Sequence, residues 1–222
     1  MLNGEKYTLT LKNQSSRFER FAIFQTLRDV ADSAVKPLSL AWIVGAAAPA
    51  NKDQSSSSEF TWRTTYNVAI INSYHMGNEL LSTNTVQMPV NISQENGFAV
   101  TYFGDFPYGA PAFVGSIMDG EKGFLIIQSD RRVPASERQY EENCFLKVGF
   151  SMAGKQVSVA DLHPDNLYRF SLDPIYRIVT GEFYPGQIIG DDPFEKSYII
   201  KFGDELKKTI ILKDENSFED GK

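Results

Sequence analysis

The chain has 222 residues, of which 42% are hydrophobic and 23% are charged, and its formal net charge is −6. This acidic balance argues against a nucleic-acid binder, which normally carries a basic surface, and against electrostatic attraction to anionic lipid heads. The length and apolar content suffice for one large domain with an ample core. No apolar stretch approaches the ~20 residues that a membrane-spanning helix needs, so we expect no stable membrane insertion.

The N-terminal segment enters a strand pattern directly, because Tyr7, Leu9 and Leu11 alternate with polar residues. It shows neither the basic start nor the apolar core of a signal peptide, so we expect a cytoplasmic protein. Cys144 is the single cysteine, which excludes an intrachain disulfide. Its place among alternating apolar residues is typical of a small buried hydrophobe rather than of a nucleophile.

Further strand patterns follow along the chain, separated by turn sequences. Arg20–Gln25 and Leu38–Val44 have apolar residues at both even and odd positions, which indicates strands that are covered on both faces. From Glu59 to Ile70 apolar and polar residues alternate, which predicts one long central strand with Trp62 and Tyr66 as packing residues. Later strands are expected at 86–92, 98–103, 123–128, 145–152, 156–160, 167–172, 175–183, 197–202 and 209–213.

About a dozen strands at regular spacing are typical of a sandwich or barrel. Helical turns have room only in Phe24–Val35 and Ala135–Asn143, and neither segment shows a sustained helical period. We therefore predict an all-β fold: a single-domain antiparallel β-sandwich of two packed sheets with little helix, spanning residues 1–213. The acidic residues 214–222 are expected to form a flexible tail or to cover a sheet edge.

No residues show the spacing of a catalytic or metal site. His163 lies between Asp161 and Asp165, but no nucleophile motif accompanies it, and HPDN is a turn sequence, so a structural histidine is expected. The carboxylates of Gly190–Glu195 lack the alternating spacing of a calcium loop. Two histidines and one cysteine are too few for a compact zinc site. We predict that the protein is not an enzyme and has no cofactor or metal.

One Gly- and Pro-rich segment is crowded with aromatic residues, namely Tyr102, Phe103, Phe106, Tyr108 and Phe113. Exposed aromatic side chains on a loop bind sugar rings, membrane interfaces or protein partners. In a β-rich chain the same residues can instead close the end of a sandwich, so both interpretations stay open. This segment is the best candidate for a binding site, and in that interpretation its ligand is carbohydrate or a membrane surface.

Several short motifs occur in the order found in a known family. SLAW (39–42), FTW followed by Tyr66, LIIQSDRRVP (125–134), VGFSMAG (148–154) and FYPGQ (183–187) resemble the rhizosphere-induced protein family (rhiA-like) over residues 6–213. The resemblance implies a small soluble bacterial protein without an assigned catalytic centre. Some members of the family are induced by population density or by plant association. The resemblance supplies no active-site residues to carry over. The chain departs from the family in its denser charge around Asp130–Glu142 and in its acidic tail.

These observations predict a non-enzymatic structural or interaction protein that self-associates into a homo-oligomer or larger assembly. A sandwich exposes edge strands, to which another copy can add through backbone hydrogen bonds. The alternative is a ligand-binding module that uses residues 102–113. A third hypothesis is a membrane-active effector, which the acidic charge disfavours.

Overall fold

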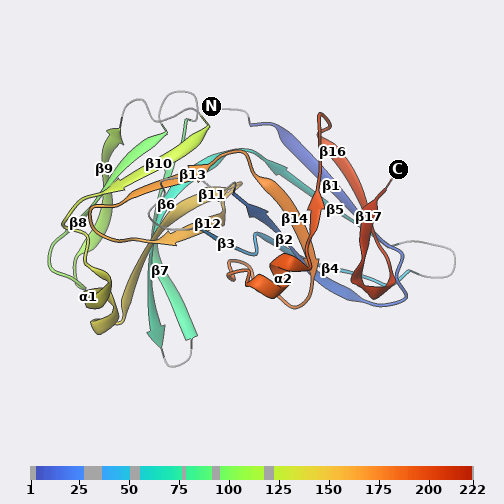
Figure 1. The fold of residues 1–222 in the computed structure, drawn as a ribbon, viewed down its shortest axis with the longest axis horizontal. Helices are drawn as coiled ribbons and strands as arrows, with labels where there is room; N and C mark the ends of the chain where they lie inside the picture. The colour runs from blue at the N-terminus through green and yellow to red at the C-terminus, as the bar shows by residue number, and fades with distance from the viewer. Residues whose placement is uncertain are drawn as a thin grey trace. The chain divides into compact units, whose positions relative to one another are not determined.

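The computed structural model describes residues 4–27, 37–50, 56–76, 79–91, 96–117 and 123–221 (Figure 1). Within these ranges the chain is mostly β-structure, as predicted, and forms four open sheets. The packing of two sheets as one sandwich, and the organisation of residues 1–213 as a single domain, stay predictions. The chain divides into two compact units: residues 1–26, 39–65 and 174–222 form unit 1, and residues 27–38 and 66–173 form unit 2.

The described part of unit 1 contains two four-stranded sheets. Their strand orders are β17-β16-β1-β5 and β15-β14-β2-β4. β1 pairs in parallel with β16 and antiparallel with β5. The strands are β1 (Lys6–Asn13), β2 (Glu19–Thr26), β4 (Ile43–Ala47), β5 (Ser56–Arg63), β14 (Ile175–Thr180), β15 (Tyr198–Ile200), β16 (Lys207–Leu212) and β17 (Phe218–Asp220).

Both tryptophans lie in the core of unit 1. Trp42 and Trp62 are 1% and 4% exposed, and their rings meet edge to face with centroids 5.2 Å apart. The rings of Tyr7, Tyr176 and Phe202 lie 6.1, 5.4 and 5.7 Å from that of Trp62. Trp62 Nε1–H also donates to the Tyr176 hydroxyl at 3.3 Å. The prediction that Trp62 is a packing residue is therefore confirmed.

Unit 2 also contains two sheets among its described residues. Their strand orders are β3-β12-β11-β6-β7 and β13-β10-β8-β9. The strands are β3 (Leu38–Ser39), β6 (Tyr66–Met76), β7 (Glu79–Pro89), β8 (Gly97–Phe103), β9 (Ala110–Ile117), β10 (Phe124–Ser129), β11 (Cys144–Met152), β12 (Lys155–Asp161) and β13 (Leu167–Ser171). The boundary between the units falls within β3, since Leu38 belongs to unit 2 and Ser39 to unit 1.

The core of unit 2 depends on close contact between β6, β11 and β12. Val68 and Phe150 lie opposite each other on β6 and β11, and both are buried. Tyr66 is 6% exposed, and its ring lies 5.9 Å from that of Phe150, so it too packs as predicted. The backbones of β11 and β12 approach so closely that a Cβ on Gly149 would lie 2.0 Å from the Ser158 carbonyl oxygen. Only glycine fits at this position.

The run predicted as one central strand is divided into two. β5 ends at Arg63 and β6 begins at Tyr66, and between Thr65 and Tyr66 the chain passes from unit 1 to unit 2. β5 is an edge strand, whereas β6 lies between β11 and β7. The alternation continues across the break because Trp62 and Tyr66 are four positions apart, an even number, and the two intervening threonines give no turn signal.

The helices are few and short among the described residues. α1 (Ser136–Glu141) confirms the prediction for 135–143. α2 (Asp191–Glu195) lies outside both segments in which helical turns were expected, and its two N-terminal aspartates suit the positive end of a helix. In the other predicted segment, 24–26 belong to β2 and 28–35 lie outside the described residues.

The C-terminal residues cover the edge of β16. After a short 3-10 turn, η1 (Asp214–Asn216), β17 pairs antiparallel with β16. Asp220 accepts hydrogen bonds from Lys208 and from the Tyr198 hydroxyl, and these bonds lower the pKa of the Asp220 carboxyl. Of the two arrangements expected for this segment, Phe218–Asp220 adopt the one that covers an edge.

Candidate functional site

Two of the five aromatic residues predicted to bind a ligand, Tyr102 and Phe106, lie in the interior. They are 4% and 5% exposed, and their rings meet edge to face at 5.4 Å. Arg138 of α1 lies over the Phe106 ring and donates to the Phe106 carbonyl at 3.3 Å. A Cβ on Gly109 would lie 2.1 Å from the Phe103 carbonyl oxygen, so the loop closes this tightly only with glycine there. The buried pair anchors the loop.

The other three aromatic residues of this segment differ in exposure. Phe103 is 51% exposed and Tyr108 is 93% exposed. Phe113 is half-buried, and its ring lies 5.8 Å from that of Phe98. A binding role for residues 102–113 therefore depends on Phe103 and Tyr108, and it stays a prediction.

α1, which contacts this loop through Arg138, is fixed by the side chain of Gln139. Gln139 is 4% exposed. Its Nε2 donates to the carbonyls of Pro134 and Leu162, both at 2.7 Å, and its Oε1 accepts from the Leu146 N–H at 2.8 Å. Because the buried amide has partners for both ends, it gives α1 one defined position on β11.

A hollow of about 650 Å³ lies beside α1, β11 and β12. Tyr140 is 78% exposed, and its ring meets that of Phe145 edge to face at 6.4 Å. Lys147 and Asp161, which also line the hollow, form an ion pair. Mostly apolar walls with a few polar groups are typical of small-ligand sites. The sequence did not reveal this hollow because its residues are brought together by strand pairing.

His163 also lines this hollow, and one of its ring nitrogens contacts α1. Its Nδ1 lies 2.8 Å from Ser136 Oγ. Its backbone N–H donates to the Tyr168 hydroxyl, and its carbonyl accepts from Ser129 Oγ, both at 2.6 Å. No described residue bonds Nε2, so the third group that would orient a catalytic pair is missing from the described part of the chain. The contacts support the expected structural role in the turn.

β7 forms one outer edge of its sheet, with β6 on one side and no described strand on the other (Figure 1). In the β6–β7 register, Val86 lies opposite Ile70 and Met88 opposite Val68. Directly opposed residues of an antiparallel pair point to the same face. Ile70 and Val68 are fully buried, whereas Val86 and Met88 are 36% and 37% exposed. The apolar face of the sheet therefore continues onto β7, where it is incompletely covered.

The sequence of β7 lacks the usual protection of an edge strand. No charged residue occurs from Leu80 to Gln94. Natural edges are usually blunted by lysine, proline or bulges. On β7 the register shift leaves one extra residue, Asn84, and Pro89 ends the strand. Between the extra residue Asn84 and Pro89, residues Thr85–Met88 form a regular, uncharged strand segment whose outer edge is open to pairing with another strand.

Cys144 is buried, as predicted, at 8% exposure. Burial raises the pKa of its thiol, and Sγ donates to Asn72 Oδ1 at 3.0 Å. Because burial outweighs the opposing effect of the Asn72 hydrogen bond, the group stays a neutral thiol at neutral pH, which suits a packing residue. Among the described residues, no three His, Cys, Asp or Glu side chains lie close enough to share a metal ion.

The comparisons with known proteins agree with the resemblance seen in the sequence. Within the described residues no helix is both long and apolar enough to cross a membrane, and no solved structure matches the chain significantly. Protein RhiA of Rhizobium leguminosarum bv. viciae is 23% identical over 99% of this chain and 87% of that protein. The family model described as RhiA matches residues 4–219. The chain belongs to the RhiA family.

Proposed function

We propose that this protein is a non-enzymatic, cytoplasmic interaction protein that self-associates through the β7 edge. The observation that carries the proposal is the partial exposure of Val86 and Met88 on the face that is buried in the neighbouring strand. A second copy that adds its own β7 would supply both the missing backbone partners and the missing apolar cover.

Pairing of β7 with β7 is isologous, since the same edge serves both copies about a two-fold axis. Antiparallel strands satisfy this symmetry, and their uncharged segments from Thr85 to Met88 place no like charges opposite each other. Register depends on the apolar face, because a slip of one residue would turn Val86 and Met88 to the other side.

The expected affinity is weak. Burying a Val or Met side chain completely contributes ~1.5–3 kcal/mol, so covering the exposed third of Val86 and Met88 in each copy contributes ~2–4 kcal/mol in total. Each new backbone hydrogen bond adds ~0.5–1.5 kcal/mol. Association costs at least ~4 kcal/mol of translational and rotational freedom. The balance predicts a dimer that dissociates on dilution, so its size must be measured over a range of concentrations.

The test compares the wild-type chain with a Val86→Lys/Met88→Lys variant by light scattering after size-exclusion chromatography. Lysines at both positions place like charges on the paired edges, so the variant should stay monomeric where the wild type dimerises. Val114→Lys is the matched control, because Val114 is 50% exposed on β9 in the same unit. A wild-type chain that is monomeric at every concentration, or a charged variant of unchanged size, would refute the proposal.

A second candidate function is carbohydrate binding where the aromatic loop meets α1. The observation that favours it is the exposure of Tyr108 and of Tyr140, which lines the hollow beside α1. Exposed tyrosine rings offer an apolar face and a polar tip, as sugar rings require. A glycan array with Tyr108→Ala and Tyr140→Ala tests it. Binding that is absent, or that survives both substitutions, would exclude this function.

A further inference from the structure

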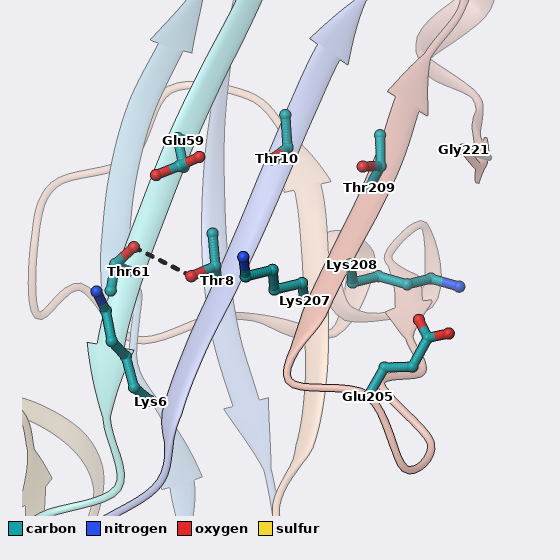
Figure 2. A pocket seen from close by; sticks show the side chains of 10 residues that line it. All are labelled: Lys6, Thr8, Thr10, Glu59, Thr61, Glu205, Lys207, Lys208, Thr209 and Gly221. Carbon is teal, nitrogen blue, oxygen red and sulfur yellow. Dashed lines mark hydrogen bonds between the residues drawn. The ribbon is translucent and has the colours of Figure 1, made fainter.

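A second hollow, of about 430 Å³, lies on unit 1 over the outward face of the sheet formed by β5, β1 and β16 (Figure 2). The face is polar because side chains alternate along β1: Leu9 and Leu11 are fully buried, whereas Thr8 and Thr10 point the other way. The volume falls within the ~300–1,000 Å³ typical of small-ligand sites.

Strand register arranges the lining of this hollow in two rows. Thr61, Thr8 and Lys207 lie side by side in one row. Glu59, Thr10 and Thr209 form the next row, two residues further along each strand. Neighbouring strands are ~4.8 Å apart, so each row presents polar groups at regular short intervals on a rigid backbone. The hydroxyls of Thr8 and Thr61 are already 3.3 Å apart and hydrogen-bonded.

Two ammonium groups lie over these rows without a carboxylate partner. Figure 2 shows the side chains of Lys6 and Lys207 extending to either side of Thr8. Neither forms an ion pair with a described residue, whereas Lys208 on the same strand as Lys207 is held by Asp220 at 2.8 Å. Lys6 and Lys207 are exposed and available to an anion.

Carboxylates limit which anion fits. Glu59 lies in the second row and Glu205 lies beyond Lys207, near Lys208 (Figure 2). Lys208 is neutralised by Asp220, so the two other lysines and the two glutamates leave the hollow without a large net charge. This balance disfavours a densely charged ligand such as a polyphosphate. The carboxylate of Glu59 and the threonine hydroxyls accept hydrogen bonds from ligand hydroxyls, and ammonium groups bind a ligand carboxylate.

From this arrangement we infer that the hollow binds an acidic saccharide, whose carboxylate is held by Lys6 and Lys207 and whose hydroxyls bond to Glu59 and the threonines. The site is distinct from the β7 edge and from the aromatic loop, and it needs neither self-association nor the exposed tyrosines. A uronic acid oligosaccharide has the required chemistry, one carboxylate and two or more free hydroxyls on each ring.

The test is an NMR titration of the isotope-labelled full chain with trigalacturonate, with neutral galactotriose and inorganic phosphate as comparison ligands. Trigalacturonate should shift the amide signals of β1, β5 and β16, and it should bind about tenfold or more weakly to Lys6→Ala/Lys207→Ala. Lys12→Ala is the matched control, because Lys12 lies on the same face of β1 but outside the hollow.

Each other outcome counts against the inference. Equal binding of galactotriose would show that the carboxylate is not recognised. Equal binding of phosphate would show a simple anion site. The absence of trigalacturonate binding to the wild-type chain, or an equal loss in Lys12→Ala, would overturn it as well. The double variant should keep the wild-type amide spectrum away from these strands, which separates lost binding from lost folding.

Discussion

Replacing Trp62 by alanine should destabilise unit 1 more than almost any other single substitution. A buried tryptophan removes ~150–250 Å² from water, and at ~25 cal/mol per Å² this amounts to ~4–6 kcal/mol. The side chain is 4% exposed and lies within 6.1 Å, ring to ring, of Tyr7, Trp42, Tyr176 and Phe202. Aromatic-to-alanine substitutions in cores cost ~3–5 kcal/mol, and we expect ~4 kcal/mol here.

Urea denaturation followed by tryptophan fluorescence measures this loss. Both tryptophans lie in unit 1, so fluorescence reports on that unit, and in Trp62→Ala the remaining Trp42 still reports. The control is Tyr184→Ala, in the same unit but 79% exposed, which should change the free energy of unfolding by less than ~0.5 kcal/mol. A loss below ~1 kcal/mol for Trp62→Ala would refute the aromatic core.

Two further predictions concern unit 2. Gly149→Ala should lower the free energy of unfolding by at least ~2 kcal/mol or prevent folding, because the new Cβ would collide with the Ser158 carbonyl. The control is Gly190→Ala in unit 1, which has open space around it and should cost less than ~1 kcal/mol. Circular dichroism during urea denaturation measures both losses, and equal effects would contradict the close approach of the two strands. Iodoacetamide should modify Cys144 at least ~10-fold more slowly in the folded chain than in urea, because the thiol is buried. Burial also raises the thiol pKa, so the reaction rate of the folded chain should rise at a higher pH than that of the unfolded chain. A folded-state rate equal to that in urea would contradict this prediction, since it would show an accessible thiolate.

Local pattern was enough to predict which residues are buried. Trp62, Tyr66 and Cys144 stand in alternating segments, and all three pack in the interior. The same pattern could not show that Thr64 and Thr65 separate two strands, because alternation continues through them. It also could not separate Tyr102 and Phe106, which are buried, from Tyr108, which is not, since exposure there depends on the close approach at Gly109.

The candidate sites depend on pairing between distant segments, and for that reason the sequence did not reveal them. Val86 was expected to begin a strand, but its exposure follows from the position of β7 at the sheet edge. Ser136 and His163 are 27 residues apart in the chain and meet only because α1 packs on β11. Thr8 and Lys207 become neighbours through a parallel pairing between the two ends of the chain.

Hydrogen–deuterium exchange of the β7 amides at low and high protein concentration tests the central claim most directly. Amides that point away from β6 are exposed in a monomer and hydrogen-bonded in a β7–β7 dimer. The account predicts that exchange between Thr85 and Met88 slows as concentration rises, while exchange on the β9 edge stays constant. Exchange of the β7 amides that does not depend on concentration would contradict self-association through this edge.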